Sequence, residues 1–215
     1  MPPFRLRKRL ERLTSKDGGI CPIAVGLTLR HLVSKCAKAN SAAFTRLRPD
    51  FAPCQLGLCT PGGCEAAVHC TRRFTESLAP DHVVVKLDFT NACDSTYHGD
   101  MLQAVFDRMP ELFAYASSAY SVPSILFYGP FCLLLQEGTH QADPLGLLVF
   151  CNTVQPLLSS LASELSLGYL DDFTLCRKVA TIAQDVNSIV ELGSKVLMAG
   201  TCPPSSHVVP VLRIE

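Results

Sequence analysis

The sequence lacks several features that mark particular classes of protein. It has no uncharged apolar run of about 18 residues, the minimum for a membrane-spanning helix, so no membrane segment is predicted. Its first residues, MPPFRLRKRLERL, contain no apolar core of the kind found in secretory signals. Its 11 cysteines are odd in number and include no CxxC pair. We therefore expect an intracellular protein, nuclear or cytoplasmic, with reduced thiols.

The chain also has no net charge, although its charges are unevenly distributed. Residues 1–50 carry 11 Lys or Arg and 3 Asp or Glu, whereas residues 51–215 carry 8 and 16. The first part would suit an anionic partner and the second part would suit cations. A solvated basic helix at the N-terminus is the alternative explanation of the basic excess.

The cysteines include one local group, formed by Cys54, Cys59, Cys64, His69 and Cys70. Zinc ribbons usually bring their ligands on tight two-residue knuckles, and the gaps here are longer. The group therefore favours small buried thiols, with a zinc-stabilised interaction domain as the alternative.

The expected strands and helices favour an α+β fold with a layered sheet. With 48% hydrophobic residues in 215, the chain can bury a substantial core. The clearest strand is HVVVKLDF, residues 82–89, whose β-branched run indicates burial on both faces. Another strand is expected at 20–26, with hairpins at 124–135 and 167–176. Helices are expected at 4–13, 27–46, 65–78, 98–108, 111–120, 144–166 and 180–198.

Two of these helices carry more detailed expectations. Asp143 is a candidate cap for the helix that Pro144 opens. The apolar residues of the helix at 27–46 recur at three- and four-residue steps and predict its buried face. They are Leu29, Leu32, Val33, Cys36 and Ala39.

Two adjacent aspartates, Asp171 and Asp172, lie between apolar runs in LGYLDDF. In an apolar setting two such carboxylates cannot both stay ionised unaided, and a bound divalent cation is the usual remedy. If strand 82–89 lies beside the hairpin at 167–176, Asp88 joins them at one sheet edge. Three carboxylates would hold two Mg²⁺ or Mn²⁺ ions about 4 Å apart, as in phosphoryl-transfer sites. Solvated turn residues are the alternative explanation of the adjacent pair.

Four segments of the chain resemble motifs of the reverse transcriptases of non-LTR retrotransposons, and they follow the family's order. They are KDGGICPIAVG at 16–26, VVKLDFTNACDS at 84–95, QEGTHQADPLGLLVF at 136–150 and GYLDDFTL at 168–175. The resemblance implies a right-hand polymerase palm, an antiparallel sheet backed by helices, with partial fingers and no thumb, as in a truncated copy.

The same resemblance implies a division of the chain. Residues 1–80 would form partial fingers with a basic N-terminal helix. Residues 81–178 would form the palm that carries the catalytic motifs, and residues 179–215 would add a palm helix and a divergent tail. A partner that supplies the missing thumb remains open.

The resemblance also implies catalytic and metal-binding residues. Asp88 and Asp171 would bind the Mg²⁺ or Mn²⁺ ions, with Asp172 assisting and the Phe89 carbonyl as a further ligand. The reaction would transfer a nucleotide from a deoxynucleoside triphosphate to the 3′-hydroxyl of a DNA primer on an RNA template.

Five further residues would contact the substrates. Lys16 would approach the triphosphate, Gln141 would lie near the nascent base pair, and Tyr169 would lie under the primer end. Ala142 takes the place of a motif glycine that lets the backbone approach closely. Cys93 takes the place of the aromatic residue that blocks a ribose 2′-hydroxyl, which leaves an RNA-templated RNA polymerase as an alternative.

Two other positions depart from the family pattern. Cys21 takes the place of an arginine expected to pair with the triphosphate, and a thiol cannot supply that bidentate contact. Beyond about residue 190 the pattern is lost, although Lys195 could stand in for an expected lysine. Two functions therefore remain open: an RNA-directed DNA polymerase and a catalytically silent nucleic-acid-binding remnant.

Overall fold

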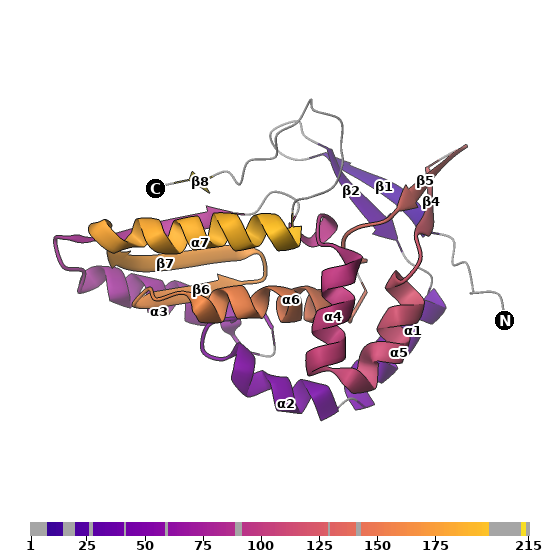
Figure 1. The fold of residues 1–215 in the computed structure, drawn as a ribbon, viewed down its shortest axis with the longest axis horizontal. Helices are drawn as coiled ribbons and strands as arrows, with labels where there is room; N and C mark the ends of the chain where they lie inside the picture. The colour runs from indigo at the N-terminus through magenta and orange to yellow at the C-terminus, as the bar shows by residue number, and fades with distance from the viewer. Residues whose placement is uncertain are drawn as a thin grey trace. The chain divides into compact units, whose positions relative to one another are not determined.

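The chain folds into two units, each built from two separate segments of sequence (Figure 1). Unit 1 comprises residues 1–44 and 93–150, and unit 2 comprises residues 45–92 and 151–215. Both units mix strands with helices, so the expected α+β class is confirmed. The computed structural model describes residues 8–14, 20–25, 28–40, 42–58, 60–88, 92–128, 130–140, 143–197 and 212–213.

The sheet of unit 1 has the strand order β2-β1-β4-β5. The pairs β1/β2 and β4/β5 are antiparallel, whereas β1 and β4 are parallel. The strands expected at 20–26 and 124–135 are confirmed. The strands are β1 (Lys8–Thr14), β2 (Ile20–Val25), β4 (Ser124–Tyr128) and β5 (Phe131–Leu135).

The helix expected at residues 4–13 is wrong, because residues 8–14 form strand β1. Leu10 and Leu13 have a helix-like spacing, which suggested the helix. Strand β1 instead pairs with β2 on one side and with β4 on the other. These ladder hydrogen bonds outweigh the weak local preference.

The helices of unit 1 include α4 (His98–Arg108) and α5 (Pro110–Tyr120), both as expected. Pro110 begins α5, and its missing N–H costs no helical hydrogen bond because the N–H of the first helical residue has no partner within the helix. The single helix expected at 27–46 is instead two, α1 (Thr28–Asn40) and α2 (Ala42–Phe51). Among the described helices of the whole chain, none combines the length and apolarity needed to cross a bilayer.

The buried face expected for α1 is also wrong. The apolar residues are exposed, as Leu29 (71% exposed) and Leu32 (55%) illustrate, whereas Arg30 and Ser34 are buried. Arg30 donates from Nε to Asp143 Oδ2 at 2.9 Å, and the Ser34 hydroxyl shares a hydrogen bond with the Tyr115 hydroxyl. These distant polar partners therefore decide which face of the helix turns inward.

Arg30 and Asp143 form a buried ion pair whose side chains are only 6% and 2% exposed. The Arg30 guanidinium also lies 5.4 Å from the centre of the Tyr120 ring, a cation–π distance. The ring of Tyr120 stacks on that of His140 with centroids 4.6 Å apart. Burial raises the pKa of Tyr120 to about 12, so its phenol stays protonated as part of this cluster.

The long helix α6 (Gly146–Ser160) begins later and ends earlier than expected. Asp143 Oδ1 accepts a hydrogen bond from the Leu145 N–H at 3.0 Å, and Gly146 N donates to the Asp143 carbonyl at 2.9 Å. Asp143 therefore organises the turn before the helix. The segment after Ser160 leads into strand β6, so the expected end near Ser166 is wrong.

The sheet of unit 2 has the order β6-β7-β3-β8, and every neighbouring pair is antiparallel. Strand β3 pairs with β7 over seven residues, from His82↔Lys178 to Asp88↔Asp172. The expected pairing of strand 82–89 with the hairpin is thus confirmed. The strands are β3 (His82–Asp88), β6 (Leu165–Tyr169), β7 (Asp172–Lys178) and β8 (Leu212–Arg213).

Two helices of unit 2 contact its sheet. Helix α7 (Val179–Leu197) lies along β7 and also contacts β3 (Figure 1). Its Ile182 and Ile189 are buried. Helix α3 (Gly63–Glu76) contacts β6, and its Phe74 packs on a cluster formed by Leu165, Leu167 and Cys176. Both helices were expected. The apolar middle of the sheet is therefore covered, which leaves polar side chains at its two ends.

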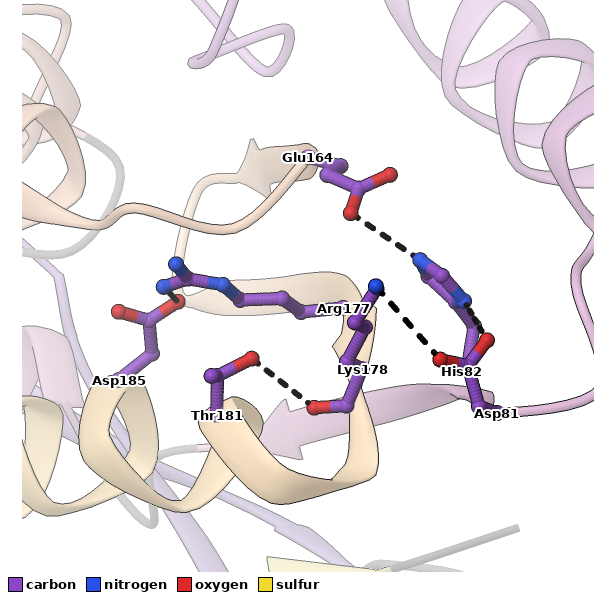
Figure 2. A network of polar contacts seen from close by, with 7 residues as sticks. All are labelled: Asp81, His82, Glu164, Arg177, Lys178, Thr181 and Asp185. Carbon is purple, nitrogen blue, oxygen red and sulfur yellow. Dashed lines mark hydrogen bonds and ion pairs between the residues drawn. The ribbon is translucent and has the colours of Figure 1, made fainter.

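One end of the sheet carries a network of charged residues around His82, the first residue of β3 (Figure 2). His82 Nδ1 lies 2.8 Å from Asp81 Oδ1, and its Nε2 lies 3.0 Å from Glu164 Oε1. Lys178 also lies 3.7 Å from Asp81. A neutral imidazole has one N–H, so only the doubly protonated ring donates to both carboxylates. The hydrogen bonds that the ring donates, first to Glu164 and then to Asp81, raise the pKa of His82.

We predict that His82 makes stability depend on pH. Because its pKa in the folded state is raised above the ordinary 6.5, its contribution is complete below that value. The contribution is lost as the pH rises through the folded pKa. The difference in unfolding free energy between the wild type and His82→Asn, measured by urea denaturation, should shrink steadily above pH 6.5. A difference that stays constant with pH would contradict the doubly protonated ring.

We also predict that Arg30→Ala destabilises the protein by about 3–5 kcal/mol, because it leaves the Asp143 carboxylate buried without its counter-charge. Lys35→Ala, at an exposed position on the same helix, is the control and should change stability by less than about 0.5 kcal/mol. Chemical denaturation measures both, and equal losses in the two variants would contradict a role for the buried pair.

Candidate active site

The three aspartates singled out by the sequence lie together in the sheet of unit 2. Asp88 ends β3 and is directly opposite Asp172, the first residue of β7. Asp172 is in turn opposite Tyr169, the last residue of β6. Residues paired in this way have Cα atoms about 4.5–5.5 Å apart. The strand register thus places two aspartates side by side, with Asp171 next to one of them.

Asp171 lies in the two-residue turn that joins β6 to β7. The other turn residue, Leu170, has a φ of 60°, in the left-handed region. That conformation costs a residue with a side chain about 1–2 kcal/mol. Tight hairpins normally place glycine or asparagine at such a position. The turn that presents Asp171 and Asp172 is therefore one that the local sequence does not favour.

A loop preceding α3 braces this hairpin through the backbone. Leu56 N donates to the Gly168 carbonyl, and Gly168 N donates to the Cys54 carbonyl, each at 2.7 Å. These bonds form a short parallel bridge between the loop and β6. The sequence gave no expectation of this contact, because the two segments are far apart in the chain.

Lys86 supplies a positive charge near the acids. Its Nζ lies 3.5 Å from Asp172 Oδ1, and the two side chains are 54% and 43% exposed. Exposed ion pairs of this kind are worth about 0–1 kcal/mol, so the carboxylate can exchange this partner for a bound cation. Sequence reasoning missed Lys86, although it lies two residues before Asp88 in the same strand and so belongs to the same alternating row.

A groove of about 530 Å³ opens beside Asp172, between α3 and the sheet. The sheet contributes Lys86, Tyr169 and Asp172 to its wall, and α3 contributes Arg72. Tyr169 is 37% exposed and lies at the end of β6, next to the turn. The groove therefore presents two basic side chains, Lys86 and Arg72, together with the carboxylate of Asp172.

The acids supply oxygen ligands, which hard cations such as Mg²⁺ prefer. Among the described side chains, no group of three or more His, Cys, Asp or Glu comes together as a metal site. The carboxylate of Asp88 lies outside that set, because only the backbone of Asp88 is described. The donor chemistry of Asp171 and Asp172, with Asp88 opposite, fits a divalent cation.

The other predicted site residues are placed as follows. Cys93 lies in unit 1, in a short helical turn at Ala92–Asp94, and its carbonyl accepts a hydrogen bond from Thr139 N at 2.6 Å. Tyr169 lines the groove. Four predicted residues lie outside the described part of the chain: Lys16, Phe89, Gln141 and Ala142. The two residues that flank the last pair, His140 and Asp143, belong to the buried cluster around Tyr120.

The cysteine group that suggested zinc is not assembled as a metal site in the described residues. Cys64 and Cys70 lie exposed on α3, and Cys59 is outside the described part of the chain. Burial raises the pKa of Cys54, which favours the protonated thiol over the thiolate that zinc requires. The expectation of buried thiols is wrong for Cys64 and Cys70, because both lie on exposed positions of α3.

Comparisons with known proteins give matches in structure alone. No protein-family model matches this sequence, and none of the curated proteins matches it. Solved structures of telomerase do match. Apo telomerase from Candida tropicalis, truncated from its C-terminal domain, covers 94% of this chain with a TM-score of 0.63 and 11% identity. The chain spans 52% of that protein.

Two further telomerase structures agree with this match. Telomerase from Candida albicans, in complex with a TWJ fragment of telomeric RNA, covers 86% of this chain with a TM-score of 0.61 and 11% identity. Another apo structure from Candida tropicalis covers 86% with a TM-score of 0.62 and 11% identity. The chain spans 39% and 40% of these two proteins. At this identity the likeness shows the fold alone, and the chain therefore has a reverse-transcriptase-like polymerase fold.

Proposed function

We propose that this protein is a reverse-transcriptase-like domain that transfers nucleotides to a primer by metal-assisted catalysis. One observation carries the proposal: the strand register sets Asp88 opposite Asp172, with Asp171 in the adjoining turn. Neighbouring carboxylates repel one another, so their grouping at one sheet edge favours a bound cation. Their position in a polymerase-like fold supports a catalytic use.

Asp88, Asp171 and Asp172 would hold Mg²⁺, with Mn²⁺ as the alternative ion and the Phe89 carbonyl as a further ligand. When bound, such ions offset the charge of the attacking and leaving oxygens. Lys86 contributes by offsetting the charge of Asp172 before a cation binds. Because an exposed ion pair contributes little free energy, the Asp172 carboxylate stays available to bind a cation.

The reaction follows from what the groove can hold. The primer's 3′-hydroxyl oxygen would bond to the α-phosphorus of a nucleoside triphosphate, the bond to pyrophosphate would break, and the hydroxyl proton would leave to solvent. Arg72 and Lys86, which line the groove, would hold backbone phosphates, and Tyr169 would contact the primer end. In this proposal the chain's own residues position the primer against the acids.

The template and the origin of the domain are part of the same proposal. The four motifs support a non-LTR retrotransposon as the relative, with an RNA template, a DNA primer and deoxynucleoside triphosphates. The match to a telomerase solved with telomeric RNA agrees with an RNA partner. Lys16, Cys93, Gln141 and Ala142 remain predicted substrate contacts. The division into fingers (1–80), palm (81–178) and palm helix with tail (179–215) also remains a prediction.

We predict that the protein extends a DNA primer on an RNA template with Mg²⁺ and deoxynucleotides. Changing Asp171 and Asp172 together to Asn should reduce extension at least about 10³-fold, because the charge that holds the cations is removed. A gel-based extension assay with both proteins at equal concentration measures the effect.

Glu76→Gln is the matched control for that experiment. Glu76 is an exposed acid at the end of α3 in the same unit, so its loss should leave extension unchanged. Extension that survives the double replacement would contradict catalysis by these acids. Absence of extension from the folded wild type would favour the second candidate function.

The second candidate is a nucleic-acid-binding domain without catalysis. Two observations favour it: cations line the groove, and Cys21 replaces the arginine expected at the triphosphate. Binding through phosphates depends steeply on salt and little on sequence, because counterions are released. An RNA–DNA hybrid that binds without being extended is the outcome that this candidate requires.

We predict that Arg72→Ala weakens hybrid binding and reduces the slope of log K against log salt by about 1, the effect of one lost phosphate contact. Arg73→Ala is the control, because Arg73 is the next residue on α3 but does not line the groove. Fluorescence anisotropy at several salt concentrations measures both slopes. Equal slopes for the two variants would show that the hybrid does not occupy this groove.

A further inference from the structure

The turn that carries the acids is held by one buried side chain. Gln55 is 0% exposed and lies in the loop between α2 and α3. Its Oε1 accepts a hydrogen bond from Leu170 N at 2.9 Å, and its Nε2 donates to the Leu170 carbonyl at 3.1 Å. A single amide thus satisfies both backbone groups of the residue with the left-handed φ.

Gln55 is itself fixed in place by its surroundings. Its Oε1 also accepts from Gly57 N at 3.1 Å, and its backbone N donates to the Phe51 carbonyl at 2.7 Å. The parallel bridge between Gln55 and Gly168 sets the distance between loop and hairpin. The amide therefore has a defined orientation, which a hydrogen bond in both directions requires.

Two glycines allow this close approach. A Cβ on Gly57 would lie 2.6 Å from Leu170 N and 2.9 Å from Leu170 Cδ2. A Cβ on Gly168 would lie 3.1 Å from Gln55 Nε2 and 2.7 Å from Leu158 Cδ1. Because neither space admits a side chain, the loop and the hairpin are shaped to each other around Leu170.

We propose that Gln55 is a positioning residue for the candidate active site. It holds the Leu170 turn in the one conformation that presents Asp171 and Asp172 beside Asp88. The proposal rests on the proposed function, since it concerns the geometry of the same acids. Leu170 is covalently next to Asp171, so a change in its backbone angles rotates the acid directly.

If Gln55 had only a structural role, its replacement would lower stability without a separate effect on the acids. A buried glutamine that only satisfies core polar groups affects stability wherever it lies. Gln55 instead makes contacts that converge on Leu170, 115 positions away in the chain. Displacement of a reacting group by about 1 Å can lower a rate about 10²-fold. The effect of Gln55 should therefore fall on the acids' metal affinity and on the rate of nucleotide addition.

The test compares the full chain with Gln55→Ala and Gln55→Glu. Alanine removes all three side-chain hydrogen bonds. Glutamate has the same shape and keeps an acceptor for Leu170 N, but it cannot donate to the Leu170 carbonyl when ionised. Gln155→Ala is the matched control, because Gln155 is another buried glutamine of unit 2 and bonds to the Asp50 carbonyl instead.

Two measurements decide the outcome. Hydrogen exchange of the Leu170 amide should be at least about 10-fold faster in Gln55→Ala than in the wild type, while Gln155→Ala leaves it unchanged. Mn²⁺ affinity, measured by electron paramagnetic resonance, should fall at least about 10-fold in both Gln55 variants. If Gln55→Ala does not fold, Gln55→Glu still reports the Mn²⁺ affinity and the exchange of the amides at positions 170–172.

Three results would count against this account, each in a distinct way. Unchanged exchange of Leu170 in the Gln55 variants overturns the positioning role, whatever their activity. Equal loss of Mn²⁺ affinity in Gln155→Ala and Gln55→Ala also overturns it, because the effect is then one of stability. A wild type that binds no Mn²⁺ overturns the proposed function, while the amide exchange still decides whether Gln55 holds the turn.

Discussion

The pairing of β3 with β7 is the constraint on which the rest of the site depends. Its register places Asp88 across from Asp172 and brings three like charges to one edge of the sheet. Carboxylates of neighbouring residues repel one another unless positive charge compensates them. Lys86 offsets the charge of Asp172 through an exposed ion pair, and under the proposed function a divalent cation would bind the same group of acids.

Carboxylates are grouped at both ends of β3, but the positive charge that balances them differs between the two ends. At His82, carboxylates from Asp81 and Glu164 are matched by a cation that the chain itself supplies. At Asp172, the chain supplies only the exposed lysine among its described partners. Under the proposed function, the second end would take further positive charge from a bound cation. This contrast is expected if one end serves folding and the other serves a ligand.

The sequence predicted the elements whose signals are local. The apolar run of β3, the hairpin at Asp171 and the helices α3, α4, α5 and α7 all follow from short-range patterns. The failures share a non-local cause. Strand β1 is fixed by partners from two other segments, and the buried face of α1 is fixed by Asp143, 113 positions from Arg30. No local pattern reports such partners.

The residues of the candidate site also differ in whether the sequence could identify them. Its acids were singled out because apolar strands flank Asp171 and Asp172, because Asp88 ends a strand expected beside them, and because the motif resemblance pointed to the same residues. Gln55 was missed because its partner, Leu170, is 115 positions away and a lone glutamine in a loop carries no signal. The sequence Gln-Leu-Gly at 55–57 can be interpreted only from the fold, in which Gly57 lies too close to Leu170 to carry a side chain.

The most direct test of the central claim is anomalous X-ray scattering from a crystal of the protein soaked with Mn²⁺. The account predicts a manganese peak about 2.0–2.3 Å from carboxylate oxygens of Asp88 and of the Asp171–Asp172 pair, with Lys86 turned away. A soaked crystal with no peak at these acids, and with Lys86 still paired to Asp172, would contradict it.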